Sequence, residues 1–367
     1  MTKKYSNSEL CLIWLDSFIG LEYKHKQALY GLINGKSDIK ELLVKGKDYI
    51  VSNIGSNEYS TLLNSANAEY LGYVIDTLDR KDIIAVTIES KDYPKSLINT
   101  SLPPLVLYCK GDTKLLAGNN FSIVGSRKSL PLSINLAKSY SEALINGGFN
   151  LVTGIAEGVD SAVLETAVKN GGKAISVLAG GFNNIYPASN ANLLNKVIEG
   201  GLAISEYPPE VAVKPFHFPI RNRIIAGLSR GTLIVSGAKK SGALYTAEYA
   251  EEYGRDLFVI PYSVGVFSGE GCNDLIKRGA MLTDRVEDVL EFYGINLEEK
   301  KKIQLTPIQS KIVSVLKNGE MHIEKICTAL NKRIFEITPV LSMLEINKIV
   351  VKNGTNVYGL VRTDLEE

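Results

Sequence analysis

Cationic and aromatic side chains are concentrated between residues 211 and 242, and this segment contains no Asp or Glu. Phe216, His217 and Phe218 stand directly before Arg221-Asn222-Arg223. In a site for single-stranded nucleic acid, cations follow the phosphates and rings stack on bases, with about 1–3 kcal/mol per stacked base. The alternative is a loop whose phenylalanines pack inward and whose cations are solvated. The cations of the segment are Lys214, Arg221, Arg223, Arg230, Lys239 and Lys240.

Two short turns rich in Gly and Ser have the composition of anion sites. Gly125-Ser126-Arg127 follows a predicted strand, and Ser241-Gly242 opens a predicted helix. Small residues let an anion approach the N–H groups at a helix start, and Arg127 adds a bidentate cation. The alternative is an ordinary turn with a surface Arg. Neither turn is a GxGxxG or Walker loop, which disfavours a standard NAD or ATP site.

Candidate catalytic groups are few. Glu206 ends a predicted strand and is either a general base or a structural partner of Arg223 or of a backbone N–H. Asp160 stands at a predicted helix start, where the N-cap role is favoured. His217 is more typical of a packed residue than of a base. Because no HExxH, GxSxG or DxD-type pattern occurs, we predict no catalytic residue, no metal and no cofactor.

The elements that position these residues alternate regularly between strand and helix. Strands with short apolar cores are predicted at 121–125, 150–153, 174–178, 203–206, 232–236 and 257–260. Helices are predicted between them at 134–145, 162–169, 191–198, 224–228 and 243–253. This alternation predicts an α/β fold with a doubly wound, parallel sheet. Ligands of such sheets bind outside the carboxyl ends of the strands, where both turns and the cationic segment begin.

The rest of the chain divides around this core. Residues 1–80 are predicted as a small all-α module, either of helix–hairpin–helix type or a packing module without a ligand. The core spans 81–294, and 295–304 form a charged linker. Residues 305–367 begin with a Thr306–Gln309 capping box and end in a hairpin with a tight Asn353-Gly354 turn. Three helices and a hairpin predict a winged-helix domain.

Composition limits the partners. The chain of 367 residues has a formal charge of +1, whereas most nucleic-acid-binding proteins carry a basic excess. Acids elsewhere cancel the cations of 211–242, so we expect nucleic acid to contact one face only.

No apolar stretch approaches the ~20 residues that span a bilayer, and the N-terminus does not resemble a signal peptide. The four cysteines form no CxxC pair, which indicates neither a zinc site nor a disulfide scaffold and favours the cytoplasm.

Seven motifs occur in an order that resembles the DprA/Smf (DNA-processing protein A) family over nearly the whole chain. They are GSR at 125–127, TGIAEGVD at 153–160, VLAGG at 177–181 with YP at 186–187, SE at 205–206, FPIRNRIIAGLS at 218–229, SGALYTA at 241–247 and GCNDLIKRGA at 271–280. The resemblance implies an extended Rossmann-like, mostly parallel core that binds single-stranded DNA without catalysis. It also implies a homodimer that protects incoming strands and helps load the RecA recombinase during natural transformation.

Carried over by motif, Arg127 would contact phosphate, Lys214, Phe218 and an Arg221–Arg223 turn would line the strand pocket, and Ser241 and Gly242 would lie beside it. The candidate DNA-binding residues are Gly125, Ser126, Arg127, Lys214, Phe216, Phe218, Arg221, Asn222, Arg223, Lys239, Lys240, Ser241 and Gly242. Two positions depart from the family. Glu157 replaces a usual Arg and predicts a less cationic rim, and Val163 stands where a His is frequent.

Two other functions stay open. A nucleotide-processing enzyme of the lysine-decarboxylase-like Rossmann group would use the same turns and Glu206, but its PGGxGTxxE signature would fall on residues 241–248, which lack the paired glycines. A regulator whose winged helix reads duplex DNA would place its third helix in the major groove. The region 334–346 carries no Lys or Arg, so a protein-contact or dimer role is equally compatible with the sequence.

Overall fold

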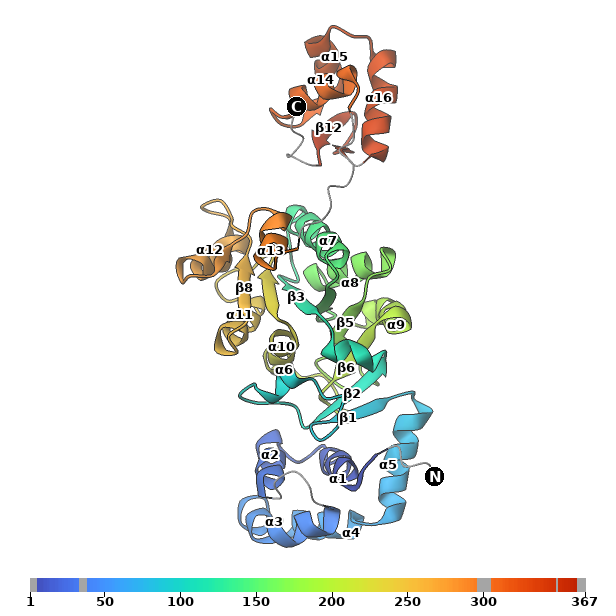
Figure 1. The fold of residues 1–367 in the computed structure, drawn as a ribbon, viewed down its shortest axis with the longest axis vertical. Coiled ribbons are helices and arrows are strands. Elements are labelled where there is room, and N and C mark those ends of the chain that lie inside the picture. The colour runs from blue at the N-terminus through green and yellow to red at the C-terminus, as the bar shows by residue number, and fades with distance from the viewer. Residues whose placement is uncertain (1–4, 33–37, 296–304, 348, 362–367) are drawn as a thin grey trace. The chain divides into compact units, whose positions relative to one another are not determined.

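A computed structural model describes residues 5–32, 38–295, 305–347 and 349–361 (Figure 1). The chain forms two compact units, Met1–Leu297 and Glu298–Glu367, each with its own apolar core. The predicted linker 295–304 lies outside the described residues except for Ile295.

The first unit begins with helices, as predicted for the N-terminal module. Their ends carry side-chain caps that satisfy free backbone N–H groups: Ser6 and Glu9 form a capping box, and Asp38 accepts from Glu41 N. Leu12 and Ile13 pack against Ile83 and Val106, so these helices share a core cluster with the sheet edge. The helices are α1 (Asn7–Asp16), α2 (Tyr23–Leu32), α3 (Ile39–Asn53), α4 (Ser56–Ser65) and α5 (Ala68–Arg80).

The described residues of this unit build a nine-stranded sheet in the order β1-β2-β6-β5-β4-β3-β7-β8-β9. From β6 to β9 the strands are parallel, and β1 and β2 add an antiparallel edge. The six predicted core strands are all present, with bounds within two residues of the prediction. The strands are β1 (Ile84–Thr87), β2 (Val106–Gly111), β3 (Asn120–Val124), β4 (Asn150–Thr153), β5 (Ala174–Val177), β6 (Leu202–Ser205), β7 (Gly231–Ile234), β8 (Asp256–Val259) and β9 (Met281–Leu282).

Helices cover both faces of the sheet, which explains why every residue of the central strands β3, β5, β6 and β7 is buried. Leu144, Leu164 and Val197 belong to the core cluster on one face, and Ile224 and Ala247 belong to the cluster on the other. The first face carries α7 (Pro131–Asn146), α8 (Val159–Lys169) and α9 (Ala191–Gly200); the second carries α6 (Lys95–Ile98), α10 (His217–Leu228) and α11 (Ala243–Glu252). The unit also contains α12 (Glu270–Lys277) and α13 (Val286–Phe292).

Helix α10 begins earlier than the predicted 224–228. It starts at His217, so Arg221, Asn222 and Arg223 lie on a helix, and the expected turn at these residues is wrong. Pro219 explains the difference because proline argues against a helix interior but is tolerated in the first turn, where its missing N–H has no intrahelical partner.

The strand order reverses between β3 and β7. These two strands are neighbours, but β3 continues through α7 to β4 on one side, and β7 continues through α11 to β8 on the other. Chain segments leave the carboxyl ends of β3 and β7 toward opposite faces, which opens a crevice between them. This switch point is where the Gly125 and Gly242 turns meet.

The second unit combines three helices with a three-stranded antiparallel sheet of order β10-β12-β11, an arrangement consistent with a winged helix. Gln309 Oε1 accepts from Thr306 N at 2.9 Å, as the capping box predicts. The hairpin loop spans 353–356 and is longer than the predicted two-residue turn. The elements are α14 (Pro307–Leu316), α15 (Ile323–Leu330), α16 (Ile334–Ile346), β10 (Met321–His322), β11 (Val350–Lys352) and β12 (Val357–Leu360).

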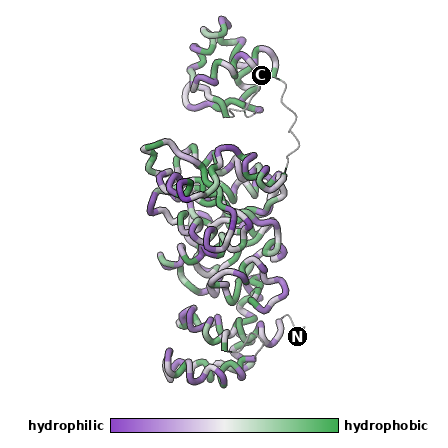
Figure 2. Tube along the Cα trace, turned by 60° about the vertical axis from the view of Figure 1, so that its left-hand side comes forward, coloured by the Kyte–Doolittle hydropathy of each residue, from purple (hydrophilic) through white to green (hydrophobic). Residues whose placement is uncertain are grey.

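Figure 2 shows short apolar segments interrupted by polar ones along both units. Within the described ranges, no helix is long and apolar enough to cross a membrane.

Candidate functional site

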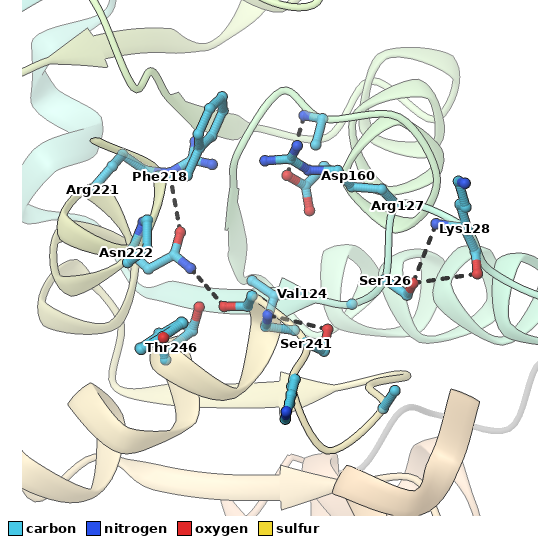
Figure 3. A pocket seen from close by; sticks show the side chains of 18 of the residues that line it. Val124, Ser126, Arg127, Lys128, Asp160, Phe218, Arg221, Asn222, Ser241 and Thr246 are labelled. Carbon is cyan, nitrogen blue, oxygen red and sulfur yellow. Dashed lines mark hydrogen bonds between the residues drawn. The ribbon is translucent and has the colours of Figure 1, made fainter. Parts of the chain in front are cut away.

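A pocket of about 1300 Å³ opens at the switch point between β3 and β7. The loop after β3, the loop after β7, the segment 213–215 and helix α10 form its walls (Figure 3). Every candidate DNA-binding residue except Phe216 and Arg223 lines it. Residues distant in the sequence therefore converge on the sheet edge that the strand pattern predicts.

An arginine and two aromatic rings form one wall, here called the aromatic shelf (Arg127, Tyr186 and Phe218). The guanidinium carbon of Arg127 lies 4.4 Å from the centroid of the Phe218 ring. The Tyr186 ring meets Phe218 edge-on, with centroids 5.8 Å apart. Tyr186 is 55% exposed and Phe218 is half-buried, so the shelf keeps ring surface open to a ligand. A cation beside open rings is what a nucleotide with its phosphate and base requires.

The N-terminus of α11 lies across the pocket from the shelf (Figure 3). Its cap residue Gly242 has no side chain, and a Cβ built there would meet nothing within 4 Å. Ser241 accepts from Ala243 N through Oγ at 3.4 Å and from Leu244 N through its carbonyl oxygen at 3.1 Å. Asn222 Nδ2 donates to Gly242 O at 3.0 Å and fixes the turn. Thr246 is fully buried, and its Oγ1 has no hydrogen-bond partner within the described residues. The positive end of the helix dipole, the open space beside Gly242 and an unpaired hydroxyl together suit an anionic ligand.

A buried charge cluster forms the floor of the pocket. Arg221 is 4% exposed and donates from Nη1 to Val177 O, and its charge acts on Asp160. Burial raises the pKa of the Asp160 carboxyl, and Arg221 opposes that rise. Gly154 makes room for both groups, because a Cβ there would lie 2.4 Å from Asp160 Oδ2 and 2.6 Å from the Arg221 terminal nitrogens.

The expected N-cap role of Asp160 is wrong. Gly158 caps α8, and Asp160 lies in the first helical turn, where its Oδ2 accepts from Ala156 N at 3.2 Å. Gly158 has φ +83°, and a Cβ there would lie 2.6 Å from the carbonyl oxygens of both Ser126 and Arg127. The backbone needs glycine at the cap because it passes close to the β3–α7 loop. With Gly158 at the cap, Asp160 falls in the first turn of α8, where it lines the pocket.

The turn after β3 is shaped by internal contacts. A Cβ on Gly125 would lie 2.6 Å from Val159 Cγ2, so glycine here permits close packing against α8. Ser126 N donates to Ser236 Oγ at 3.1 Å, and Ser126 Oγ accepts from Lys128 N at 3.2 Å. The Ser126 N–H is thus already used within the protein, and anion binding at this turn falls to the Arg127 side chain.

Two candidate residues lie outside the pocket. Arg223 is 3% exposed and pairs with Glu206, which resolves the two alternatives for Glu206 in favour of the Arg223 partner. Burial raises the pKa of the Glu206 carboxyl, and Arg223 opposes the rise. Phe216 is 57% exposed and packs edge-on against His217. DNA contact by Arg223 or Phe216 therefore receives no support from the shape of the pocket.

His217 is a packed residue, as its surroundings in the sequence indicate. Its ring stacks on Tyr207 with centroids 4.3 Å apart, and its Nδ1 lies 3.0 Å from Ala179 O. Burial lowers the pKa of His217, and the nearby Lys214 charge contributes in the same direction. His217 N donates to Lys214 O at 3.0 Å, which joins the first residue of α10 to the segment that carries Lys214.

The sequence analysis missed several lining residues. Lys128 directly follows the candidate Arg127. Phe267 lies between β8 and α12, and Glu270 is the first residue of α12, a part of the chain for which no structure was predicted. Tyr245 and Thr246 belong to the SGALYTA motif but lack a charge that would single them out. Glu157 is exposed, accepts from Ser189 Oγ at 3.3 Å and does not line the pocket. Its negative charge therefore stays outside the group of lining cations.

Fold and site together define a doubly wound α/β protein with a basic, aromatic pocket at its switch point. Residues 84–294 match the family described as DNA recombination-mediator protein A. The chain is 37% identical to the DNA processing protein DprA of Bacillus subtilis over 219 residues, which cover 59% of this chain and 74% of that protein. It is 36% identical to Protein Smf of Escherichia coli over 207 residues, 56% of this chain and 55% of that protein. The chain belongs to the DNA recombination-mediator protein A family.

Two solved structures resemble this chain. The X-ray structure of DprA from Streptococcus pneumoniae aligns with a TM-score of 0.63 at 28% identity, covering 80% of this chain and 99% of that chain. A structure of DprA from Helicobacter pylori, solved to explain its single-stranded DNA binding mode, aligns with a TM-score of 0.52 at 29% identity. The second alignment covers 57% of this chain and 95% of that chain.

Proposed function

We propose that this protein binds single-stranded DNA in the switch-point pocket as a recombination mediator, protects incoming strands and passes them to the RecA recombinase. The observation that carries the proposal is the aromatic shelf, where Arg127 lies over Phe218 with Tyr186 at the ring edge. Family membership and the single-stranded DNA described for the Helicobacter pylori relative support it. Natural transformation is the process in which such a mediator would act.

The pocket chemistry favours an unpaired strand. Arg127, Lys128, Lys214 and Lys240 line the pocket, and no acid of the described residues lies within ion-pair distance of them. These cations are available to phosphates, and the open rings of Phe218 and Tyr186 are available to bases. A duplex hides its base faces by stacking and pairing, whereas an unpaired strand can turn its bases toward the shelf.

We propose a binding role without catalysis. The candidate base Glu206 pairs with Arg223 and does not line the pocket, and the His217 ring nitrogen Nδ1 faces Ala179 O. The nucleotide-processing enzyme considered above would use Glu206 as its general base. With Glu206 paired to Arg223, that reaction would lack its carboxylate.

The assembly proposed for the protein is a homodimer formed through the α/β core. A measurement of particle mass, with and without RecA, tests both the dimer and the recombinase partner.

Duplex reading by the C-terminal unit receives little support, because α16 contains no Lys or Arg and exposes Phe335, Met343 and Ile346.

The test of the function is a titration of labelled oligo-dT and of a duplex of equal length at two salt concentrations. We expect preference for oligo-dT and an affinity that falls steeply with salt, because each phosphate contact releases counterions. Equal affinity for duplex, or no dependence on salt, would contradict the proposal. Release of free base from a nucleoside monophosphate would restore the enzymatic alternative.

A further inference from the structure

Helix α10 has two sides with different neighbours. Phe218, Arg221, Asn222 and Ile225 line the pocket, whereas Arg223 is buried outside it. Successive helical residues are rotated by about 100°, so Arg223 lies on the side that faces away from Phe218. The orientation of the pocket residues therefore depends on what holds the Arg223 side of the helix.

The Arg223 side is enclosed by a carboxylate and by a ring from the N-terminal helices. Arg223 Nη2 donates to Glu206 Oε2, and the two side chains are 3% and 5% exposed. The guanidinium carbon of Arg223 lies 5.7 Å from the centroid of Tyr23 in α2. Glu206 Oε1 and Arg223 Nε are buried without a hydrogen-bond partner in the described chain. Few hydrogen bonds thus secure the pair, and the Tyr23 ring is the group of the N-terminal helices that lies against it.

Tyr23 itself is held in place by the segment that leads into β2. Its hydroxyl donates to Pro103 O, and Gln27 Nε2 donates to Tyr23 Oη at 2.8 Å and to Pro103 O at 3.2 Å. The ring cannot leave Arg223 without breaking these hydrogen bonds.

A second buried group fixes the same side of α2. Lys26 Nζ donates to Asp16 Oδ1 at 2.9 Å, and Tyr108 in β2 donates to Asp16 Oδ2 at 2.8 Å. Lys26 and Asp16 are each 5% exposed. Because a buried charge is costly to separate from its partner, α1, α2 and β2 form a rigid support behind α10.

We infer that the N-terminal helices position the pocket: Tyr23, acting through the Arg223–Glu206 pair, holds α10 in the orientation that presents Phe218, Arg221 and Asn222 to the DNA strand. Arg223 is then a positioning residue that does not touch the ligand. The inference rests on the proposed function for the identity of the ligand, and it assigns a role to the N-terminal helices.

The test variant is Tyr23→Ala in the full chain, because it removes the ring and leaves every pocket residue unchanged. Tyr23→Phe keeps the ring and is the conservative variant. Tyr30→Ala is the matched control, since Tyr30 lies two turns along the same side of α2 and donates to Glu89 Oε1 at 2.5 Å. Two quantities are measured: hydrogen exchange of the amides of 217–228 without DNA, relative to α8, and the dissociation constant for labelled oligo-dT.

Tyr23→Ala is expected to speed exchange in 217–228 and to weaken oligo-dT binding about three- to tenfold, as loss of a desolvated cation–π contact implies. Tyr30→Ala is expected to match the wild type in both measurements. Tyr23→Phe keeps the ring but loses its hydroxyl hydrogen bond to Pro103 O, so it is expected to lie between the wild type and Tyr23→Ala. Unchanged exchange in Tyr23→Ala, or faster exchange with unchanged affinity, would overturn the inference. If the wild type itself does not bind oligo-dT, the proposed function fails, whereas unchanged exchange alone would show that Tyr23 does not hold α10.

Discussion

Arg127 and Phe218 meet across the switch point, with the guanidinium carbon 4.4 Å from the ring centroid. Arg127 belongs to the turn after β3, and Phe218 lies in the first turn of α10, 91 residues later in the chain. The contact brings together a cation and an open ring, the two groups proposed to meet a phosphate and a base. A strand that enters the pocket therefore meets groups that are already oriented, which lowers the entropy lost on binding.

The first prediction concerns the coupling of these two residues. Arg127→Ala and Phe218→Ala should each weaken oligo-dT binding by about 1–3 kcal/mol, because one loses a phosphate contact and the other a stacked base. The double variant should lose less than the sum, with a coupling energy of about 0.5–1 kcal/mol. Fluorescence anisotropy on the four proteins measures the cycle. Strict additivity would show that the contact does not serve binding.

The second prediction uses the empty space beside Gly242. Gly242→Val places a side chain where the backbone meets nothing within 4 Å, so it should fill the α11 end of the pocket with little effect on folding. Oligo-dT affinity should fall at least about fivefold, or ~1 kcal/mol, if a phosphate approaches the N-terminus of α11.

Gly72→Val in α5 is the matched control, because that position is equally open and lies in the N-terminal helices. Binding by this control should equal that of the wild type. Undiminished affinity in Gly242→Val would remove the α11 N-terminus from the binding site.

The third prediction separates two arginines by their effect on stability. Arg223→Met leaves Glu206 as an unpaired buried carboxylate and should lower the free energy of unfolding by about 3–5 kcal/mol. Arg127 is exposed, so Arg127→Ala should change it by no more than about 0.5 kcal/mol. Urea unfolding followed by circular dichroism measures both. Similar midpoints for the two variants would contradict the division of their roles.

The fourth prediction concerns pH. Burial lowers the pKa of His217 in the folded protein, so the unfolded chain binds a proton at a higher pH than the folded one. The contribution of His217 to stability is therefore complete above about pH 6.5, the ordinary pKa of histidine, and is lost as the pH falls toward the lower folded pKa.

The measurement compares urea midpoints at pH 7.5 and pH 5.5 for the wild type and for His217→Asn, whose amide can still reach Ala179 O. The loss of stability on acidification should be smaller in the variant. An equal loss in both proteins would show that His217 does not carry a shifted pKa.

Much of the fold follows from local pattern. The core strands were predictable because strands buried on both faces carry short continuous apolar runs, as in Leu233, Ile234 and Val235. The location of the pocket followed from the same pattern, since it lies at the carboxyl ends of parallel strands. The sequence pattern did not predict the start of α10. Proline is unfavourable inside a helix, so Pro219 indicates a break, but in the structure it lies in the first turn of a helix that begins at His217.

The candidate site was predictable in its members but less so in their roles. Arg221 and Arg223 look equivalent in the sequence, and only the helix places one at the pocket floor and the other against Glu206. Arg230 resembles them too, yet its guanidinium carbon lies 4.1 Å from the Tyr293 ring, outside the pocket. The sequence predicts Asp160 as a helix cap, but Gly158 takes that position because its backbone passes close to Ser126. Such distinctions depend on contacts between distant segments.

The central claim is that single-stranded DNA occupies the switch-point pocket. Photo-crosslinking of a 5-iodouracil oligonucleotide to the full chain, followed by mapping of the crosslinked peptides by mass spectrometry, tests it most directly. We expect crosslinks at Phe218 and Tyr186 that are lost when unlabelled oligo-dT competes. Crosslinks confined to the C-terminal unit 305–361, with none on the aromatic shelf, would contradict it.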